Sequence, residues 1–156
     1  EGFKIAMYAL DMGRFTVAAG ALGTIRAALE ASVWYANERF TFGKPIGRNQ
    51  FIQEMVAEMV RGLETSRLLV YNAAWRKNMG VRNTRETSLA KWHATEASFK
   101  DAHLAVQING AYLYSAEYQV ERLFRNARAP LIYEGTTEIH KLLQAEDALG
   151  YRKLNG

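Results

Sequence analysis

Apolar residues recur at helical spacing along most of the chain, and only two prolines, Pro45 and Pro130, interrupt them. One run of five apolar residues has the i, i+3, i+4, i+7 spacing that places side chains on a single helix face. These residues are Ile52, Met55, Val56, Met59 and Leu63. Continuous alternation of apolar and polar residues, which is typical of a half-buried strand, is hard to find. The sequence therefore predicts an all-α fold.

Breaks in the periodicity divide the chain into three long and two shorter helices. The long helices are expected over residues 5–39, 49–79 and 84–109, and the shorter ones over residues 120–127 and 136–149. Long helices joined by short loops favour an antiparallel up-down bundle. A chain of 156 residues suits one domain, so residues 1–156 are interpreted as a single helical domain.

Residues at the expected helix ends fit this division. Gly80 and Gly110 stand where a left-handed glycine commonly ends a helix. Asn49 is a candidate N-cap for the second long helix. Asn83 and Glu86, three residues apart, resemble a capping pair for the third.

Most of the remaining glycine lies in the connections and in the first helix. The connection 40–48 contains Gly43, Pro45 and Gly47 and predicts turns, whereas residues 111–118 are expected to be irregular or partly helical. Within the first helix, Gly20 and Gly23 each lower helix propensity by about 1 kcal/mol relative to alanine. Because alanines surround them, we expect a second helix to approach the backbone closely there.

Composition excludes several classes of site. The sequence has no cysteine, which excludes disulfides and thiolate metal sites, and His93, His103 and His140 form no evident metal constellation. No apolar run approaches the roughly 18 residues that span a membrane. Residues 1–4 are not followed by the apolar core of a signal peptide. The net charge of +4 favours polyanionic partners, but the basic residues are spread along the chain.

The segment 131–139 carries the clearest candidate for chemistry. Glu134 lies in a loop before a helix start, after apolar and aromatic residues and before Gly135. Apolar surroundings disfavour the charged form of a carboxylate, which suits a general base. Thr136 and Thr137 add hydroxyls at a helix N-terminus, where free N–H groups suit a phosphate or the polar edge of a flavin. From these residues alone, Glu134 is either a base or an exposed loop charge.

Three other segments have both a binding and a structural interpretation. In the segment 38–50, donors such as Arg39 and Thr41 flank a glycine-rich loop that either holds a nucleotide diphosphate or forms a turn. In the segment 107–112, the amides after Gly110 either contact a ligand or only end a helix. Asp11 and Arg14, three residues apart, predict a local ion pair.

In this order, the segments resemble the acyl-CoA dehydrogenase family over nearly the whole chain, which corresponds to the C-terminal third of its members. The most specific stretch is Ile132-Tyr133-Glu134-Gly135-Thr136-Thr137-Glu138-Ile139. Residues 38–50, residues 107–110 and the opening helix from Asp11 through Gly23 agree as well. Four motifs in the same order as in the family support the resemblance more strongly than a single motif would. The family's N-terminal helical domain and middle β domain are not among these 156 residues, so we expect a fragment that is inactive in isolation.

The resemblance implies an oxidoreductase of fatty acid β-oxidation that removes two hydrogens across the α–β bond of an acyl-CoA thioester with FAD. It implies that Glu134 takes the α-proton while the β-hydrogen leaves as hydride to flavin N5. The flavin ribityl chain and the amide of Glu134 would stabilise the thioester oxygen. A minority branch carries its base near the position of Gly13. Glycine cannot serve as a base, which supports Glu134.

The resemblance also implies binding roles for other residues. Asp11, Arg14, Tyr133 and Gly135 are expected at the acyl-CoA substrate. The expected FAD contacts, some of them to the cofactor of a neighbouring subunit, are Arg39, Phe40, Thr41, Asn49, Gln50, Gln107, Ile108, Asn109, Gly110, Ala111, Thr136, Thr137 and Glu138. Ala111 and Glu138 stand where many relatives have Gly and Gln. An anionic Glu138 would repel a reduced flavin.

Partners follow from the same resemblance. A cofactor site shared between subunits implies a homodimer or homotetramer, with electron-transfer flavoprotein as electron acceptor, in the bacterial cytoplasm or the mitochondrial matrix. No membrane or metal partner is expected. Two alternatives stay open: a nucleic-acid-binding homologue, suggested by the net charge of +4, and a non-catalytic oligomerisation domain, suggested by the Ala/Gly-rich first helix.

Overall fold

A computed structural model describes residues 1–155 except for the side chain of Tyr114. Within this part, the predicted three long and two shorter helices are present. They are α1 (Gly2–Glu38), α2 (Gln50–Asn78), α3 (Thr84–Asn109), α4 (Gln119–Arg128) and α5 (Thr137–Ala148). Short 3-10 helices, η1 (Ile46–Arg48), η2 (Gly110–Tyr114) and η3 (Ala129–Leu131), join them. The predicted all-α class is confirmed.

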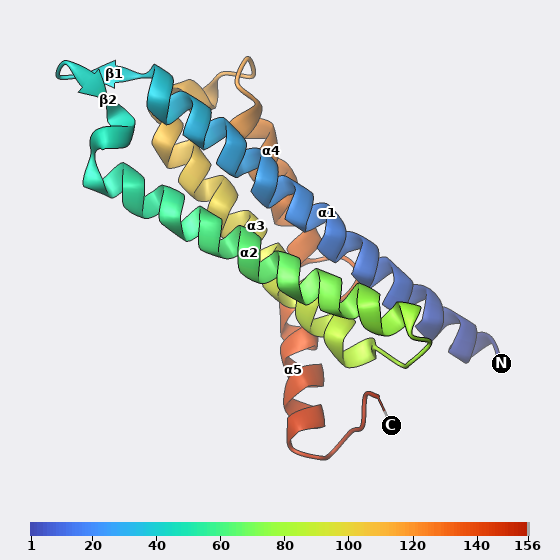
Figure 1. Cartoon of the computed structure of the whole chain (residues 1–156). Coiled ribbons are helices and arrows are strands. Elements are labelled where there is room, and N and C mark those ends of the chain that lie inside the picture. Colours follow the sequence, from blue (N-terminus) through green and yellow to red (C-terminus); the bar gives the residue numbers. More distant parts are fainter. Residues whose placement is uncertain (156) are drawn as a thin grey trace.

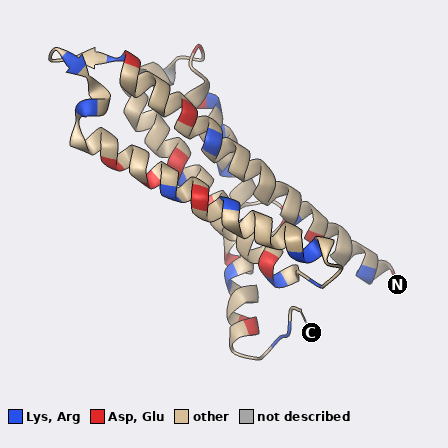
Figure 2. Cartoon of the chain, in the orientation of Figure 1, with Lys and Arg blue, Asp and Glu red and all other residues tan. Residues whose placement is uncertain are grey.

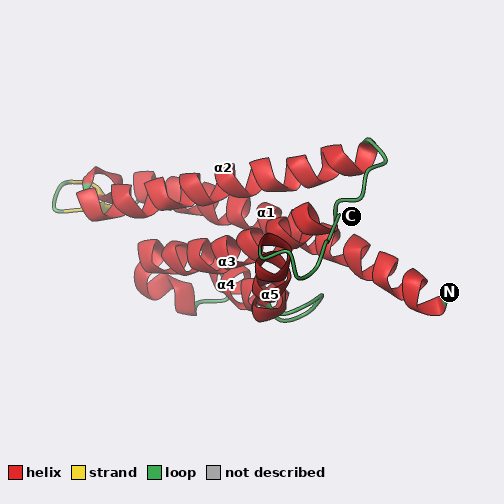
Figure 3. Cartoon of the chain, turned by 90° about the horizontal axis from the view of Figure 1, so that it is seen from below, coloured by secondary structure: helices red, strands yellow, loops and turns green. Residues whose placement is uncertain are grey.

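Consecutive long helices run antiparallel, as predicted, so α2 runs opposite to α1 and α3, and α3 lies in the middle of the molecule (Figure 1). The shorter α4 returns along α3, and α5 then leaves the bundle direction and crosses it at a steep angle (Figures 1 and 3). Both α4 and α5 pack on α3. The loop between them therefore lies against the long helices rather than at the end of the bundle.

Small side chains form the contact between α1 and α3. Ala18, Ala21 and Ala28 of α1 are buried, as are Ala90, Ala94 and Ala105 of α3. Alanine lets two helix axes approach closely and lets many atoms reach van der Waals distance. Larger apolar residues such as Ile25, Met59 and Ile108 fill the space between these contacts.

The predicted close approach at Gly20 and Gly23 is wrong. Both residues are exposed, and a Cβ atom added to either would meet nothing within 4 Å. The contact face of α1 is instead formed by the alanines one to three positions away. Close approach occurs at four other glycines, Gly13, Gly47, Gly62 and Gly135, each next to residues of another segment.

The connection between α1 and α2 contains more structure than predicted. Phe40–Thr41 (β1) pairs antiparallel with Lys44–Pro45 (β2), with Phe40 opposite Pro45 and Thr41 opposite Lys44. Phe42 and Gly43 form the tip, both at positive φ, and the hairpin projects beyond the end of the bundle (Figure 1). A two-residue strand is too short to show alternation in the sequence.

The predicted caps lie at the right positions but do not act as caps. Asn49 and Asn83 precede α2 and α3, yet neither side chain makes a cap hydrogen bond. The Asn83 amide donates instead to the carbonyl of Ala73, at 2.9 Å. Glu86 accepts a hydrogen bond from Asn155, at 2.7 Å, rather than reaching back to Asn83.

Charged side chains are mixed over the helices. Figure 2 shows Lys and Arg interspersed with Asp and Glu, and several form ion pairs within one helix, such as Arg26–Glu30 at 2.8 Å. The net positive charge is thus not concentrated on one helix.

Across residues 1–155, no helix is both long enough and apolar enough to cross a bilayer.

Candidate active site

Glu134 lies in the loop between η3 and α5, in an unusual backbone conformation. Its φ is +56° and that of Gly135 is +92°, so two consecutive residues occupy left-handed geometry. Glycine adopts such angles freely, but for glutamate the conformation costs energy, on the order of 1 kcal/mol or more. Contacts with neighbouring helices must therefore hold the loop in place.

The carboxylate of Glu134 lies directly over Gly13 of α1. A Cβ atom added to Gly13 would come within 2.5 Å of Glu134 Oε2 and 2.6 Å of its Cδ. Oε2 is buried and accepts no hydrogen bond from any described residue. A buried carboxylate oxygen without a donor is rare, and it is the kind of atom that can accept a proton from a ligand.

Arg14, the next residue of α1, lies on the same side of the loop. Its Nη1 donates to Asp11 Oδ1 at 3.2 Å, which confirms the predicted ion pair. Thr84 of α3 donates to the other oxygen of Asp11 at 2.7 Å. The Nε atom of Arg14 is buried without a recorded partner, 3.8 Å from a Cβ added to Gly135. Asp11 thus fixes Arg14, which keeps one donor for a ligand.

Two buried side chains support the loop from behind. Lys91 of α3 is fully buried and donates from Nζ to the carbonyl of Gly135, at 2.6 Å. His140 of α5 is also fully buried, and its Nδ1 lies 2.9 Å from Ser88 Oγ. Burial lowers the pKa of Lys91 to about 8, with Arg14 lowering it further and Glu134 opposing the shift. Burial, together with Lys91 and Arg14, lowers the pKa of His140 to about 4.

The surroundings of Glu134 are therefore not the apolar pocket that the sequence predicted. Arg14 and Lys91 place two cations near one carboxylate, and His140 is a neutral neighbour at pH 7. Tyr133, before the base, is half exposed, at 49%. The apolar run 131–133 had suggested an apolar environment, but the loop turns Glu134 away from it and towards α1.

A cavity of about 790 Å³ opens on the face of α1 that carries Asp11 and Met12. It runs between the start of α1 and the α2–α3 loop. Its apolar lining comes from Phe3, Met7, Tyr8, Met12, Phe15 and Val81, and its polar lining includes Asp11, Thr84 and Lys77. A cavity of this size that combines apolar side chains with charged and polar ones suits an extended organic ligand with polar groups.

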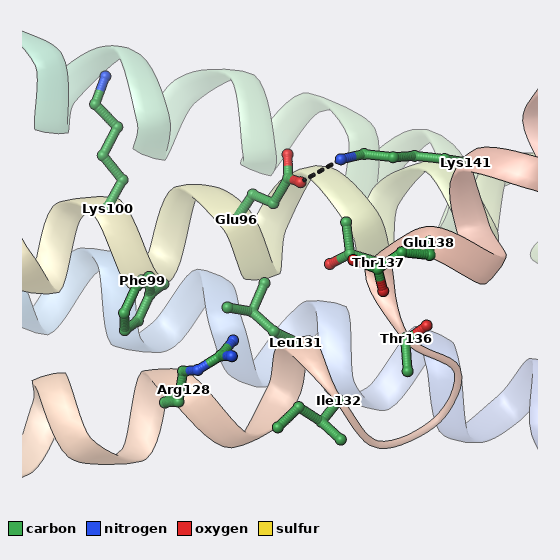
Figure 4. A pocket seen from close by; sticks show the side chains of 10 residues that line it. All are labelled: Glu96, Phe99, Lys100, Arg128, Leu131, Ile132, Thr136, Thr137, Glu138 and Lys141. Carbon is green, nitrogen blue, oxygen red and sulfur yellow. Dashed lines mark ion pairs between the residues drawn. The ribbon is translucent and has the colours of Figure 1, made fainter.

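A second cavity, of about 330 Å³, lies beside the loop, between α3, α4 and the start of α5 (Figure 4). Thr136, Thr137 and Glu138 line it together with Arg128 and Lys141, and Lys141 pairs with Glu96 at 3.2 Å. The hydroxyl of Thr137 is buried without a recorded partner. The backbone amide and the Thr136 hydroxyl lower the pKa of Glu138. An unpaired hydroxyl, cations and helix-terminal amides form a donor set that fits a polar cofactor such as FAD.

The remaining predicted cofactor residues lie elsewhere. Arg39, Phe40 and Thr41 belong to the hairpin end, with Asn49 and Gln50 at the start of α2. Arg39 follows Gly13 by 26 residues of nearly continuous helix, which is about 39 Å along the axis. These residues cannot reach a ligand beside Glu134 of the same chain. The structure thus separates the predicted cofactor residues into two groups.

Residues 107–111 lie at the hairpin end as well. Ile108 and Asn109 are core residues, and the Asn109 amide donates to the carbonyl of Ala105 at 2.8 Å. Gln107, Gly110 and Ala111 are exposed. The guanidinium of Arg39 lies 5.8 Å from the ring centre of Tyr112. Any ligand contact of Ile108, Asn109 or Gly110 has to come from the backbone, whereas the exposed Gln107 can use its side-chain amide.

Several residues near Glu134 were not identified from the sequence. Lys91, Ser88 and Thr84 received no role, and His140 was considered only as a metal ligand and set aside. The sequence did contain one indication that Lys91 is buried. At helical spacing it lies on the same face as three small residues, Ser88, Ala94 and Ser98. A lysine on a face with that composition is a candidate for burial. Metal clusters of three or more His, Cys, Asp or Glu side chains do not occur in the described chain.

Comparison with known proteins identifies the family. Residues 1–149 match the family described as acyl-CoA dehydrogenase, C-terminal domain. The chain is 47% identical over 150 residues to an acyl-CoA dehydrogenase of Bacillus subtilis, covering 96% of this chain and 40% of the relative. It is 43% identical over 143 residues to a caffeyl-CoA reductase–Etf complex subunit of Acetobacterium woodii, covering 92% and 38%.

Among solved structures, the glutaryl-coenzyme A dehydrogenase–glutaryl-CoA complex superposes with a TM-score of 0.94 at 42% identity, covering 98% of this chain and 39% of that one. The chain thus spans about two fifths of the length of the relatives it matches. It belongs to the acyl-CoA dehydrogenase family, whose C-terminal domain it forms.

Proposed function

We propose that the complete polypeptide carrying this chain is an FAD-dependent acyl-CoA dehydrogenase in which Glu134 removes the α-proton of an acyl-CoA thioester. The observation that supports this proposal is the carboxylate of Glu134. A loop in left-handed geometry holds it over Gly13, and one buried oxygen has no hydrogen-bond donor. A general base needs such a free acceptor atom within reach of the substrate.

Lys91 lies close enough to Glu134 for their opposite charges to attract, and Arg14 lies near Lys91 and the Gly135 backbone. The cavity on α1 reaches Asp11 and Met12, the two residues before Gly13 in the chain, but neither Gly13 nor Glu134 lines it. The Glu134 carboxyl can return the proton when the reaction runs as a reduction.

FAD, when bound, would accept the β-hydrogen of the substrate as hydride. The residues that would hold it are Thr136, Thr137 and Glu138 at the start of α5, beside the cavity that contains the unpaired Thr137 hydroxyl. The hairpin residues Arg39, Phe40 and Thr41 would contact the cofactor of a second copy, because they lie about 39 Å from Gly13 along α1. The proposal therefore includes a homodimer or homotetramer.

Electron-transfer flavoprotein is the proposed redox partner, in line with the Etf complex named for the Acetobacterium relative. That relative is named as a reductase and the Bacillus relative as a dehydrogenase. The two names describe acyl-CoA reactions that run in opposite net directions. We propose that the redox partner, and not Glu134, determines the direction.

The test is the bleaching of FAD by acyl-CoA in stopped flow, with the complete polypeptide loaded with FAD. A series of straight-chain acyl-CoA thioesters is mixed with the wild type and with Glu134→Gln. We expect the variant to bleach at least 10³-fold more slowly, since it keeps the shape of the side chain and loses the proton acceptor. Glu30→Gln, exposed on α1, is the matched control and should bleach at the wild-type rate.

If Glu134→Gln bleached the flavin at the wild-type rate, another residue would have to be the base, and this domain would have a structural role. The domain would then correspond to the oligomerisation module considered from the sequence. A nucleic-acid-binding role finds no support in the mixed charges of Figure 2.

A further inference from the structure

Lys91 is a buried cation in the first half of α3. Its side chain is 0% exposed, and the hydrogen bond recorded for Nζ goes to a backbone carbonyl, that of Gly135, and not to a carboxylate. Taking an ammonium group out of water is costly, and an apolar residue of similar length would avoid that cost. A neutral carbonyl compensates only part of it. The position thus keeps a charge that packing alone does not require.

The carbonyl that Lys91 holds is one residue after Glu134. Glu134 and Gly135 both have positive φ, and α5 begins two residues later, at Thr137. Fixing the Gly135 carbonyl against α3 fixes the Gly135–Thr136 peptide, which is one peptide beyond the one that follows the Glu134 Cα atom. The loop can then shift little at Glu134, so the bond from Lys91 helps to keep the carboxylate over Gly13.

Ser88 and His140 hold the same loop one turn away. Ser88 lies three residues before Lys91 on α3, and its Oγ is 2.9 Å from His140 Nδ1. A Cβ added to Gly135 would lie 3.1 Å from His140 Nε2, so the ring is packed against the Gly135 backbone. Lys91 and His140 therefore contact Gly135 from two helices, α3 and α5.

Three charged or titratable groups lie near Glu134. Arg14 approaches the loop from α1 and binds Asp11, Lys91 faces the loop from α3, and His140 packs on it from α5 as a neutral ring at pH 7. Asp11 is occupied by Arg14 and by the Thr84 hydroxyl. Lys91 is thus the cation that acts both on the loop backbone and, through space, on the Glu134 carboxylate.

We infer that Lys91 is a positioning residue for the reaction, holding the Gly135–Thr136 peptide next to the base so that the Glu134 carboxylate meets the α-proton. The inference rests on the proposed function of Glu134. Its consequence is specific to one step, because a displaced base slows proton removal without changing how acyl-CoA binds. Misplacing a reacting group by about 1 Å costs on the order of 10²-fold in rate.

The experiment compares wild type, Lys91→Met and Lys91→Gln as complete, FAD-loaded polypeptides, with rates expressed per bound flavin. The substrate is the acyl-CoA that bleaches the wild type fastest, used with hydrogen or deuterium at Cα. Lys91→Met removes both the donor and the charge, whereas Lys91→Gln retains a donor. We expect Lys91→Met to bleach about 10²-fold more slowly, with a larger α-deuterium isotope effect and an unchanged Kd for acyl-CoA.

The glutamine variant separates two ways in which Lys91 can act. Recovery of most of the rate in Lys91→Gln supports positioning through the hydrogen bond to Gly135. A rate as low as that of Lys91→Met supports a contribution from the charge as well. Thr95→Val is the matched control, because it also removes a buried polar group, one turn away from Lys91 on α3. The Thr95 hydroxyl does not contact the loop but donates within its own helix, for example to the Lys91 carbonyl at 2.9 Å. Thr95→Val should keep the wild-type rate and isotope effect.

Wild-type rates and isotope effects in both Lys91 variants would overturn the inference. If Glu134→Gln abolishes bleaching and the Lys91 variants do not slow it, only the positioning role fails. If Glu134→Gln bleaches normally, the proposed function fails first, and Lys91 has no base to position.

Discussion

The carboxylate of Glu134 occupies the space that a side chain on Gly13 would need. A Cβ atom at position 13 would lie 2.5 Å from Oε2 and 2.8 Å from Oε1, well inside van der Waals contact. The two residues come from segments 121 positions apart in the chain. Glycine at position 13 is thus a condition for the observed place of the carboxylate, and this relationship can be tested directly.

Gly13→Ala should impair the reaction while leaving the fold intact. Within a helix, alanine is favoured over glycine by about 1 kcal/mol, so the substitution does not weaken α1 itself. The new methyl group displaces the Glu134 carboxylate, and we expect flavin bleaching by acyl-CoA to slow by about 10²-fold. The rate is measured in stopped flow on the FAD-loaded polypeptide, and the fold is monitored by circular dichroism.

Gly20→Ala is the matched control for this substitution. It lies two turns further along the same helix, exposed, with nothing within 4 Å of an added Cβ. We expect it to raise the free energy of unfolding by about 0.5–1 kcal/mol and to leave the bleaching rate unchanged. Equal rates for Gly13→Ala and Gly20→Ala would show that the carboxylate does not need its observed position.

Local sequence rules predicted the helices well because their signals lie within a few residues of each helix end. The third helix was expected over residues 84–109, and α3 has those bounds because Gly110 turns the chain with a φ of +60°. Rules of this kind say nothing about which face is covered. The contact face of α1 was misplaced to Gly20 and Gly23 because glycine alone does not show whether a partner helix is present.

The candidate site could be predicted only in part, for a related reason. Glu134 was found from its motif, but its contacts come from distant segments. Lys91 contacts the Gly135 carbonyl across 44 positions, and Ser88 contacts His140 across 52. A lysine in a helical pattern normally indicates a solvated face. Only the tertiary fold shows that the face bearing Lys91 is covered by the loop before α5.

Acid should weaken the fold through His140. The pKa of the buried ring is about 4, whereas that of an unfolded histidine is 6.5. Below pH 6.5 the unfolded chain binds a proton that the folded chain does not, so stability is lost as the pH falls from about 6.5 to about 4. The loss attributable to His140 is about 3 kcal/mol. Urea unfolding of the wild type and of His140→Gln between pH 4.5 and 7.5 measures it.

The difference in unfolding free energy between these two proteins isolates His140 from other groups that titrate in the same range. We expect the wild type to be the more stable at pH 7.5, where it keeps the contact with Ser88, and its advantage to shrink as the pH falls. A difference that does not vary with pH would contradict the assignment of a neutral, buried ring.

Phe42 at the hairpin tip should matter for assembly rather than for folding. Its side chain is fully exposed, at 102%, and its φ of +52° is unfavourable for a bulky residue. Asparagine tolerates that backbone conformation, so Phe42→Asn should change the free energy of unfolding by no more than about 0.5 kcal/mol. If the hairpin contacts the cofactor of a second copy, the variant should lose FAD on gel filtration. Tyr151→Asn, also exposed, is the control, and equal flavin content in both variants would count against the hairpin contact.

Asp101 should make the stability of the chain depend on pH near neutrality. It is buried on α3 against Gly62 of α2, and its Oδ2 has no recorded hydrogen bond. Burial raises the pKa of Asp101 from 3.8 to about 7, while Lys100 and Arg61 partly oppose the shift and Glu58 adds to it. Between pH 4 and 7 the folded chain binds a proton that the unfolded chain has lost, so this contribution falls as the pH rises.

Replacing the carboxyl by an amide removes that dependence, because asparagine has the same shape and no charge. Relative to the wild type, Asp101→Asn should gain about 3 kcal/mol in unfolding free energy between pH 4.5 and pH 8, since a fully ionised Asp101 costs at most about 4 kcal/mol. Urea unfolding at the two pH values measures the gain, and Glu30→Gln on the exposed face of α1 should show none. If Asp101→Asn gains no more than this control, the carboxylate is ionised in the folded chain without cost, and Lys100 or Arg61 must reach it in solution.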